Sequence, residues 1–319
     1  MSRYSELRER RLASLEPVDR ARFENGRPPL RSIGVAGMRE RGKQLAGYPP
    51  VDDPSVAWHD VVVDGPHGPI PTRIFTPTAK ASRPRAIYLH THGGGYVMWG
   101  GLDVPHNLNT ATAKDNDCIV VAPDFRLPPE HPFPVPLEDC FAAFQWTAKN
   151  AAAIGGRPGK ICIGGGCTGG NLAAAVTLMA RDAGGPMPAA QCLQATVFDA
   201  RCEYLSMYEN SEGYMLSRDD DQWVIEQYLQ DMEHRFDWRA SPILAKTMKG
   251  LPPTLIRVGE WDVLRDEGIA YANRCRDAGV DVTLTLVPGE SHSQNPQHAR
   301  EAAVEMAAFL KKYVGPDAA

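Results

Sequence analysis

The feature that most constrains the fold of this chain is a glycine-rich turn between an apolar run and a helix-forming run. The stretch Lys160–Gly164 is short and apolar with β-branched residues, which is typical of a buried parallel strand. The stretch Gly170–Ala180 is rich in good helix formers. Between them lies Gly165-Gly166-Cys167-Thr168-Gly169. A strand, a tight turn and a helix in this order predict a nucleophile elbow, in which a reactive side chain sits on a strained turn.

A cysteine at such a turn has a favourable environment for nucleophilic chemistry. Small neighbours let another backbone segment cross closely, and the free N–H groups of the following helix favour a thiolate, the reactive form of cysteine. The same five residues also fit a plain strand–helix turn with a buried structural cysteine, because the pattern is short. The remaining motifs of the chain decide between these two interpretations.

Composition excludes several classes of protein. A formal net charge of -5 provides no basic footprint and argues against nucleic-acid binding. No apolar run approaches membrane-spanning length, and Met1–Glu6 lacks the apolar region of a signal peptide, so we expect no membrane span and a cytoplasmic location. The seven cysteines form no C-x₂-C pair, which favours reduced thiols over a zinc site or a disulfide framework.

Strand-like and helix-like patterns alternate along most of the chain. Between Leu137 and Phe144, for example, apolar residues at positions 137, 140, 141 and 144 form the stripe of an amphipathic helix. We expect strands at 61–63, 72–75, 85–92, 118–123, 160–164, 193–198, 254–259 and 282–287, and helices at 137–144, 170–180, 266–278 and 298–313. The first two strands predict a hairpin. The repeated strand–helix units predict an α/β fold whose mostly parallel sheet is covered by helices on both faces.

Two segments fall outside this alternation, namely residues 1–50 and the insert at 200–240. We interpret them as a cap over the edge of the sheet at which open α/β folds bind ligands, although surface decoration is the simpler alternative. Aromatic residues of the insert and of the segment after residue 92 are predicted to line the substrate pocket; each could instead pack the cap onto the core. They are Tyr96, Trp99, Tyr204, Tyr208, Tyr214 and Trp223.

The second motif, His92-Gly93-Gly94-Gly95-Tyr96, directly follows a predicted strand. Consecutive glycines let a backbone turn several N–H groups toward one point, which is what an oxyanion hole requires. An acid and a histidine follow two later strands: Asp262 comes just after Thr254–Gly259, and His292 comes after Val282–Val287. Asp266 and Glu267 are interpreted instead as acids of a helix N-terminus. Nucleophile, acid and histidine thus occur in the order found in α/β-hydrolases.

With these motifs the chain resembles the hormone-sensitive-lipase-like esterases, the bacterial HGGG carboxylesterases of the α/β-hydrolase fold. The resemblance extends from about residue 55 to about residue 315. Besides His92–Tyr96 it includes several further stretches. These are Asp124–Pro134, Gly169–Ala173, Ala240–Pro242, Leu251–Pro253 and Asp262–Glu267.

The resemblance implies an α/β-hydrolase catalytic domain at 51–319, with an N-terminal cap segment at 1–50 and a cap insert at 200–240. It implies a triad at Cys167, Asp262 and His292, and an oxyanion hole formed by the backbone N–H groups of Gly94, Gly95 and Thr168. It also implies that no metal or organic cofactor is needed and that the protein can form a homodimer.

The chain departs from the family pattern around the nucleophile. The family elbow usually reads Gly-Asp-Ser-Ala-Gly, so Gly166, Cys167 and Thr168 replace aspartate, serine and alanine. Loss of the aspartate removes a negative charge that would oppose a thiolate, and Thr168 narrows the site. After His292 the chain has Ser293–Asn295, where glycine and phenylalanine are common. We interpret the protein as a hydrolase that cleaves a small to medium ester or lactone through an acyl-enzyme on cysteine.

Three alternatives remain open. An acyltransferase or an amide- or thioester-processing enzyme would use the same cysteine acyl-enzyme. A non-catalytic receptor is possible on this fold, as in the plant gibberellin receptors, but those lose the triad histidine that is present here as His292. Cys167 could be a laboratory replacement for serine, although the atypical Gly166 and Thr168 beside it argue against a single engineered change.

Overall fold

The computed structural model describes residues 28–211, 215–292 and 296–315, together with single positions between 6 and 24. One central sheet has the strand order β1-β2-β4-β3-β5-β6-β7-β8. The strands are β1 (Val56–Gly65), β2 (Gly68–Pro77), β3 (Arg85–His90), β4 (Ile119–Pro123), β5 (Gly156–Gly166), β6 (Ala190–Gln194), β7 (Thr254–Gly259) and β8 (Val282–Val287). The hairpin β1–β2 is antiparallel and β2 also pairs antiparallel with β4, whereas all other neighbours are parallel. The predicted mostly parallel sheet is confirmed.

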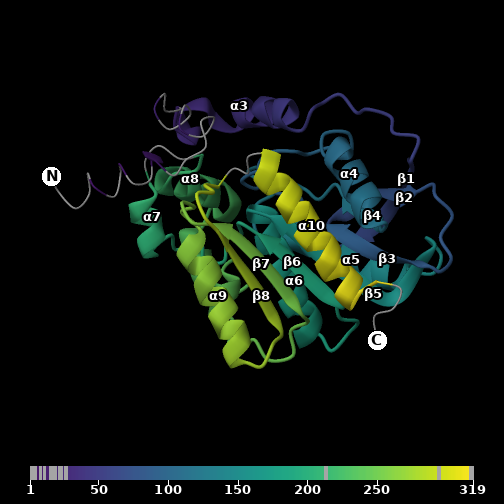
Figure 1. Cartoon of the computed structure of the whole chain (residues 1–319). Coiled ribbons are helices and arrows are strands. Elements are labelled where there is room, and N and C mark those ends of the chain that lie inside the picture. Colours follow the sequence, from purple (N-terminus) through teal and green to yellow (C-terminus); the bar gives the residue numbers. More distant parts are fainter. Residues whose placement is uncertain are drawn as a thin grey trace.

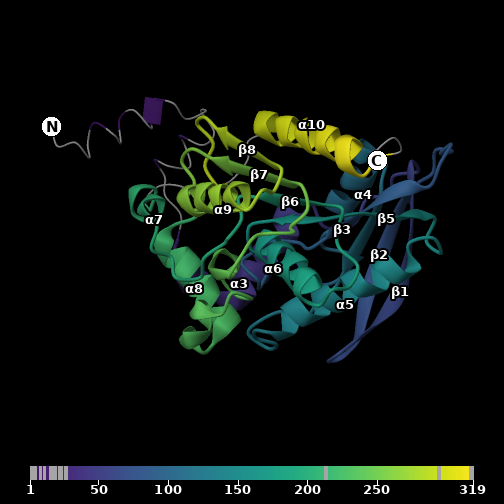
Figure 2. The ribbon, with the colours of Figure 1, turned by 90° about the horizontal axis from the view of Figure 1, so that it is seen from below.

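Helices cover both faces of this sheet. The helices of the described residues are α3 (Leu30–Leu45), α4 (His106–Asn116), α5 (Val135–Asn150), α6 (Thr168–Asp182), α7 (Leu205–Glu209), α8 (Arg218–Leu229), α9 (Arg265–Asp277) and α10 (Pro296–Tyr313), with short 3-10 turns η1 (Met232–Phe236) and η2 (Pro242–Leu244). Figure 2 shows α4 and α10 on one side of the sheet and α5 and α6 on the other. Helix α9 packs against β7 and β8. None of the helices in the described ranges combines the length and apolar character needed to cross a bilayer.

The core consists of two apolar clusters separated by the sheet. The larger cluster includes Ile87 and Ile163 of the sheet with residues of α5, α6 and α9, and the smaller includes Phe309 of α10 with residues of α4. Because the central strands are covered on both faces, every residue of β4 and of β7 is buried. This explains why β4 is visible in the sequence as a continuous apolar run and β7 as a mostly apolar one that contains the buried Arg257.

The strand expected at 193–198 is displaced in the structure. Strand β6 ends at Gln194, and the next residue, Ala195, has a φ of 42°, which takes the backbone out of the sheet. Val197 and Phe198 are buried although they lie outside the strand. The N–H of Val197 donates to the carbonyl of Cys167 at 3.4 Å. The apolar run continues past the strand because these residues pack beneath the elbow.

Helix α3 lies against α8 (Figure 1). It also contacts the loop that follows β3, where Arg39 donates to the carbonyl of Val97 at 3.2 Å. The N–H of Leu30 donates to Asp220 Oδ1 at 2.7 Å, and Arg31 forms an ion pair with Glu226 at 2.9 Å. Near the other end of α3, the carbonyl of Gly42 accepts from the indole N–H of Trp99. Parts of residues 1–50 and of 200–240 therefore meet on the loop that the sequence assigns to the oxyanion hole.

Candidate active site

The turn between β5 and α6 has the geometry of a nucleophile elbow. Cys167 adopts φ 55° and ψ -125°, a backbone conformation that L-residues rarely populate, directly before the first residue of α6. A Cβ atom on Gly165 would collide with the carbonyl oxygen of Thr91, which lies in the loop after β3. A glycine is therefore required at the point where that loop crosses the turn. The N–H of Cys167 donates to Gln194 at 2.8 Å, which anchors the elbow to the neighbouring strand.

Cys167 differs from the other cysteines in its exposure. All seven are free thiols, but only Cys167 is partly exposed, and the other six are buried. Burial raises the pKa of Cys118 and the pKa of Cys275 to about 12, so these thiols stay protonated and unreactive at neutral pH. Among the seven cysteines, the structure thus presents a single accessible thiol, at the elbow.

Asp262 and His292 meet as their positions after two neighbouring parallel strands predict. His292 Nδ1 lies 3.1 Å from Oδ1 and 3.0 Å from Oδ2 of Asp262. The aspartate is fully buried, and its Oδ1 also accepts the N–H of Leu264 at 3.0 Å. Asp266 instead accepts the N–H of Ser206 at 2.9 Å and lies in the first turn of α9, as the sequence interpretation expected.

The environment of His292 favours its charged form. Burial opposes protonation of the ring, but the charges of Asp262 and Cys167 and hydrogen bonds with both side chains raise the pKa of His292 well above its usual value. The ring of His292 is therefore hydrogen-bonded both to the carboxylate of Asp262 and to the thiol of Cys167. Such an arrangement can hold a thiolate beside an imidazolium.

The loop that follows β3 crosses directly over the elbow. A Cβ atom on Gly93 would collide with the carbonyl of Gly166 and lie 3.4 Å from Cys167 Cβ. Gly94 has a φ of 98°, which glycine tolerates far better than other residues. In the described part of the chain the N–H groups of Gly94 and Gly95 have no backbone acceptor, and that of Thr168 belongs to the unpaired first turn of α6. The donors needed for an oxyanion hole are thus present next to the sulfur.

Three of the aromatic residues predicted to contact substrate have clear packing partners. Tyr96 is buried and its ring stacks on Tyr228 with centroids 3.9 Å apart. Trp99 donates its indole N–H to Gly42, and Trp223 is buried within α8. Each of these side chains helps to hold the helices of the insert and α3 onto the core, and their contact with substrate stays a prediction.

Of the other three, the structure describes two, which belong to α7 and its N-cap. Tyr204 precedes α7 and is partly buried, and burial together with the charge of Asp199 raises its pKa to about 12. Tyr208 is 55% exposed, with the guanidinium of Arg218 4.6 Å above its ring. Tyr214 lies outside the described residues. For these residues too, a role in substrate binding stays a prediction.

A buried acidic cluster near the site was not predicted from the sequence. Asp221 of α8 is fully buried, and its Oδ2 accepts from the thiol of Cys202 at 3.2 Å. Burial raises the pKa of Asp221 to about 6, against the opposing effects of the Cys202 hydrogen bond and the positive charge of His292. Burial, followed by the charges of Asp221 and Asp199, raises the pKa of Glu267 well above the usual range.

The local pattern explains why the cluster escaped notice. Asp219, Asp220 and Asp221 look like ordinary acids at the start of a helix, and Asp220 does complete a capping box with Ser217. Glu267 likewise lies in the first turn of α9, yet it is fully buried. The sequence offered one signal of the buried cluster: three consecutive aspartates stand at the start of α8, although the capping box uses only Asp220.

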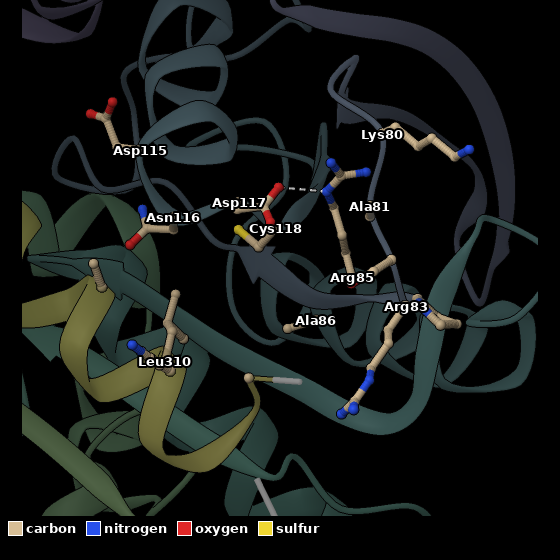
Figure 3. Close-up of a pocket in the computed structure, with 15 residues that line it drawn as sticks. Lys80, Ala81, Arg83, Arg85, Ala86, Asp115, Asn116, Asp117, Cys118 and Leu310 are labelled. Atoms are coloured by element: carbon tan, nitrogen blue, oxygen red, sulfur yellow. Dashed lines mark hydrogen bonds and ion pairs between the residues drawn. The ribbon is translucent and has the colours of Figure 1, made fainter. Parts of the chain in front are cut away.

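A cavity of about 480 Å³, shown in Figure 3, lies beside the starts of β3 and β4. It is bounded by the beginning of β3, the end of α4 and the end of α10, and Arg85 forms an ion pair with Asp117 at 2.7 Å on its wall. The thiol of Cys118 borders it, but burial keeps that thiol protonated. No residue of the elbow, the glycine loop or the Asp262–His292 pair lines this cavity.

Comparison with known proteins agrees with this fold. A family model described as an alpha/beta hydrolase fold matches residues 88–295, a range that includes the glycine loop, the elbow and both Asp262 and His292. The chain therefore belongs to this α/β-hydrolase family and is related to the hormone-sensitive-lipase-like carboxylesterases, as the sequence resemblance implies.

Individual relatives and solved structures extend the comparison. The carboxylic ester hydrolase LipN of Mycobacterium tuberculosis is 39% identical over 73% of this chain, and the match covers 63% of LipN. The esterase LipI of the same organism is 35% identical over 80% of this chain and 81% of its own length. A hyperthermophilic esterase from the archaeon Pyrobaculum calidifontis superimposes with a TM-score of 0.83 at 29% identity, covering 93% of this chain and 98% of the esterase.

Proposed function

We propose that the protein is a carboxylic ester hydrolase that acts through an acyl-enzyme on Cys167, with His292 as the base and Asp262 as its partner. One observation carries the proposal: the single accessible thiol lies on a strained elbow and interacts with a histidine whose Nδ1 is held by a buried aspartate. Relatives that are themselves named as esterases support the class of reaction.

The first half of the reaction forms a thioester. The thiolate of Cys167 attacks the carbonyl carbon of the ester, a C–S bond forms, and the carbonyl π electrons move to oxygen. The N–H groups of Gly94, Gly95 and Thr168 would stabilise this oxyanion, each by about 3 kcal/mol in the transition state. The tetrahedral species then collapses, and the C–O bond breaks. The His292 imidazolium gives its proton to the departing alkoxide, and the alcohol leaves.

The second half of the reaction releases the acid. His292 takes a proton from water as the oxygen attacks the thioester carbonyl, and the same N–H groups receive the second oxyanion. Collapse breaks the C–S bond and regenerates the thiolate beside the imidazolium, while the carboxylic acid leaves. Asp262 keeps the Nδ1 side of the ring occupied, so that the other ring nitrogen carries the proton transfers.

We assign substrate selection to a cap that includes α3, α7 and α8, over a catalytic domain at 51–319. The contacts of α3 with α8 and with Trp99 support this division. A small to medium ester or lactone is the expected substrate. Acyl transfer is the second candidate, because a thioester intermediate on Cys167 reacts readily with amines. The free state of all seven cysteines supports a reducing compartment such as the cytoplasm.

Intact-protein mass spectrometry tests the proposal. The protein is incubated briefly with a panel of p-nitrophenyl esters, thioesters and lactones and then quenched in acid. We expect one acyl adduct on Cys167 that is absent in Cys167→Ala and present in Cys275→Ala, the matched loss of a buried cysteine. Turnover that survives in Cys167→Ala, or an adduct on another residue, would contradict the assignment. Persistence of the adduct until an amine is added would favour acyl transfer over hydrolysis.

A further inference from the structure

The side chain of Thr168 makes a contact that the usual alanine at this position cannot make. Thr168 is the first residue of α6, immediately after Cys167, and it is buried. Its Oγ1 accepts the backbone N–H of Tyr96 at 3.1 Å. Tyr96 directly follows Gly94 and Gly95 in the chain. The residue after the nucleophile is thus bonded, through its side chain, to the loop that supplies the other two oxyanion donors.

Tyr96 needs such a partner because its conformation is constrained from several sides. Its φ of 60° lies in the left-handed region, which is unfavourable for a residue with a side chain. Its ring is stacked on Tyr228 of α8, with an interplanar angle of 8°. An unpaired N–H at this buried residue would cost about 1–3 kcal/mol, so the Thr168 hydroxyl stabilises the conformation that the ring stack requires.

The same loop is confined on its other side by α8. A Cβ atom on Gly95 would lie 2.8 Å from Val224 Cγ1, one helical turn before Tyr228. The loop therefore lies between the start of α6, which holds it through Thr168, and α8, which packs against Gly95 and Tyr96. Rotation of the Tyr96 peptide would change the direction of the preceding N–H groups, because the three residues are consecutive.

We propose that Thr168 is a positioning residue for the oxyanion hole and acts through its side-chain hydroxyl. By accepting the N–H of Tyr96 it fixes the end of the glycine loop and leaves the N–H groups of Gly94 and Gly95 directed at the substrate oxygen. This inference rests on the proposed function, since the hole is used only when Cys167 is acylated. It assigns to the Thr168 side chain a role separate from that of its own backbone N–H.

Two reactions of the same sulfur separate this role from a general structural one. Acylation by p-nitrophenyl acetate passes through an oxyanion and needs the hole. Alkylation by iodoacetamide displaces iodide at a saturated carbon, forms no oxyanion, and needs only the thiolate of Cys167. A defect confined to the hole slows the first reaction and spares the second.

The test compares Thr168→Val, which keeps the shape and removes the hydroxyl, with Thr168→Ser, which keeps the hydroxyl. Thr177→Val is the matched control, because Thr177 is also buried in α6 and its hydroxyl only donates to Ala173. We expect Thr168→Val to lower kcat for acylation about 10- to 100-fold with KM changed less than about threefold, a partial loss of one donor's contribution. Alkylation of Cys167 should stay within about twofold of wild type, and Thr168→Ser should restore acylation.

Several outcomes would overturn the inference. An equal fall of acylation and alkylation would mean that the hydroxyl supports the elbow itself. Unchanged acylation in Thr168→Val, or a Thr168→Ser protein as slow as Thr168→Val, would exclude a role for the hydroxyl. A wild-type protein that is alkylated but never acylated at Cys167 would instead refute the proposed function. If melting curves show that Thr168→Val does not fold, Thr168→Ala carries the same comparison against Thr168→Ser.

Discussion

Replacing Asp221 by asparagine should stabilise the protein, and the gain should grow with pH. Asp221 is fully buried, and burial raises its pKa from 3.8 to about 6 although Cys202 and His292 act in the opposite direction. The folded state binds this proton more tightly than the unfolded chain does. Its contribution to the free energy of unfolding is therefore fully present below about pH 4. It is lost as the pH rises through about 6.

The magnitude follows from the two pKa values. A carboxyl group whose pKa rises from 3.8 to about 6 on folding costs the folded protein about 3 kcal/mol once it is fully ionised. At pH 4.5 the group is mostly protonated in the folded protein, and the cost is only about 1 kcal/mol. Asparagine has no proton to release. The stability of Asp221→Asn relative to wild type should therefore increase by about 2 kcal/mol between pH 4.5 and pH 8.

Urea unfolding followed by tryptophan fluorescence at several pH values measures this difference. The change with pH is the quantity to compare, because any packing difference between aspartate and asparagine is the same at both ends of the range. Asp219→Asn is the control, since Asp219 lies in the same helical turn but is exposed. A difference for Asp221→Asn that is flat with pH, or that shrinks as the pH rises, would refute the reasoning.

Three further predictions concern the proposed triad and Asp266 beside it. His292→Ala should remove nearly all ester turnover and slow the alkylation of Cys167 at pH 6, because the raised pKa of His292 normally keeps an imidazolium beside the sulfur; a fully active variant would contradict the mechanism. Asp266→Asn should lower the melting temperature but leave kcat nearly unchanged, since Asp266 bonds to Ser206 and Arg265; a collapse of kcat would implicate it in catalysis. Cys167→Ser should not raise activity on p-nitrophenyl acetate; a gain of orders of magnitude would mean a site shaped for serine.

Much of the fold could be predicted because burial leaves a regular trace in the sequence. The strands Thr254–Gly259 and Val282–Val287 were predicted with the bounds found in the structure, since apolar or β-branched runs end there in turn residues. The strand near Leu193 was misplaced because Val197 and Phe198 are apolar for another reason, namely packing beneath the elbow. Hydrophobicity reports burial but does not distinguish a strand from a buried loop.

The candidate site divides in the same way. The proximity of Asp262 and His292 followed from their places after adjacent parallel strands, which is a property of topology. The bond between Thr168 and Tyr96 and the burial of Asp221 depend on which distant segments pack together. A threonine after a nucleophile, or an acid at a helix start, looks the same in the sequence whether it faces water or another loop.

Helix α8 takes part in two contacts that are far apart in the chain. Asp220 and Glu226 of this helix hold the N-terminal segment at Leu30 and Arg31. Val224 and Tyr228 of the same helix pack against the glycine loop. The free energies of substitutions in these two regions are therefore not expected to add, because both act on the position of one rigid element. If the N-terminal segment were exchanged for that of a relative, the reaction rate at Cys167 should consequently change, although no residue in contact with Cys167 would be replaced.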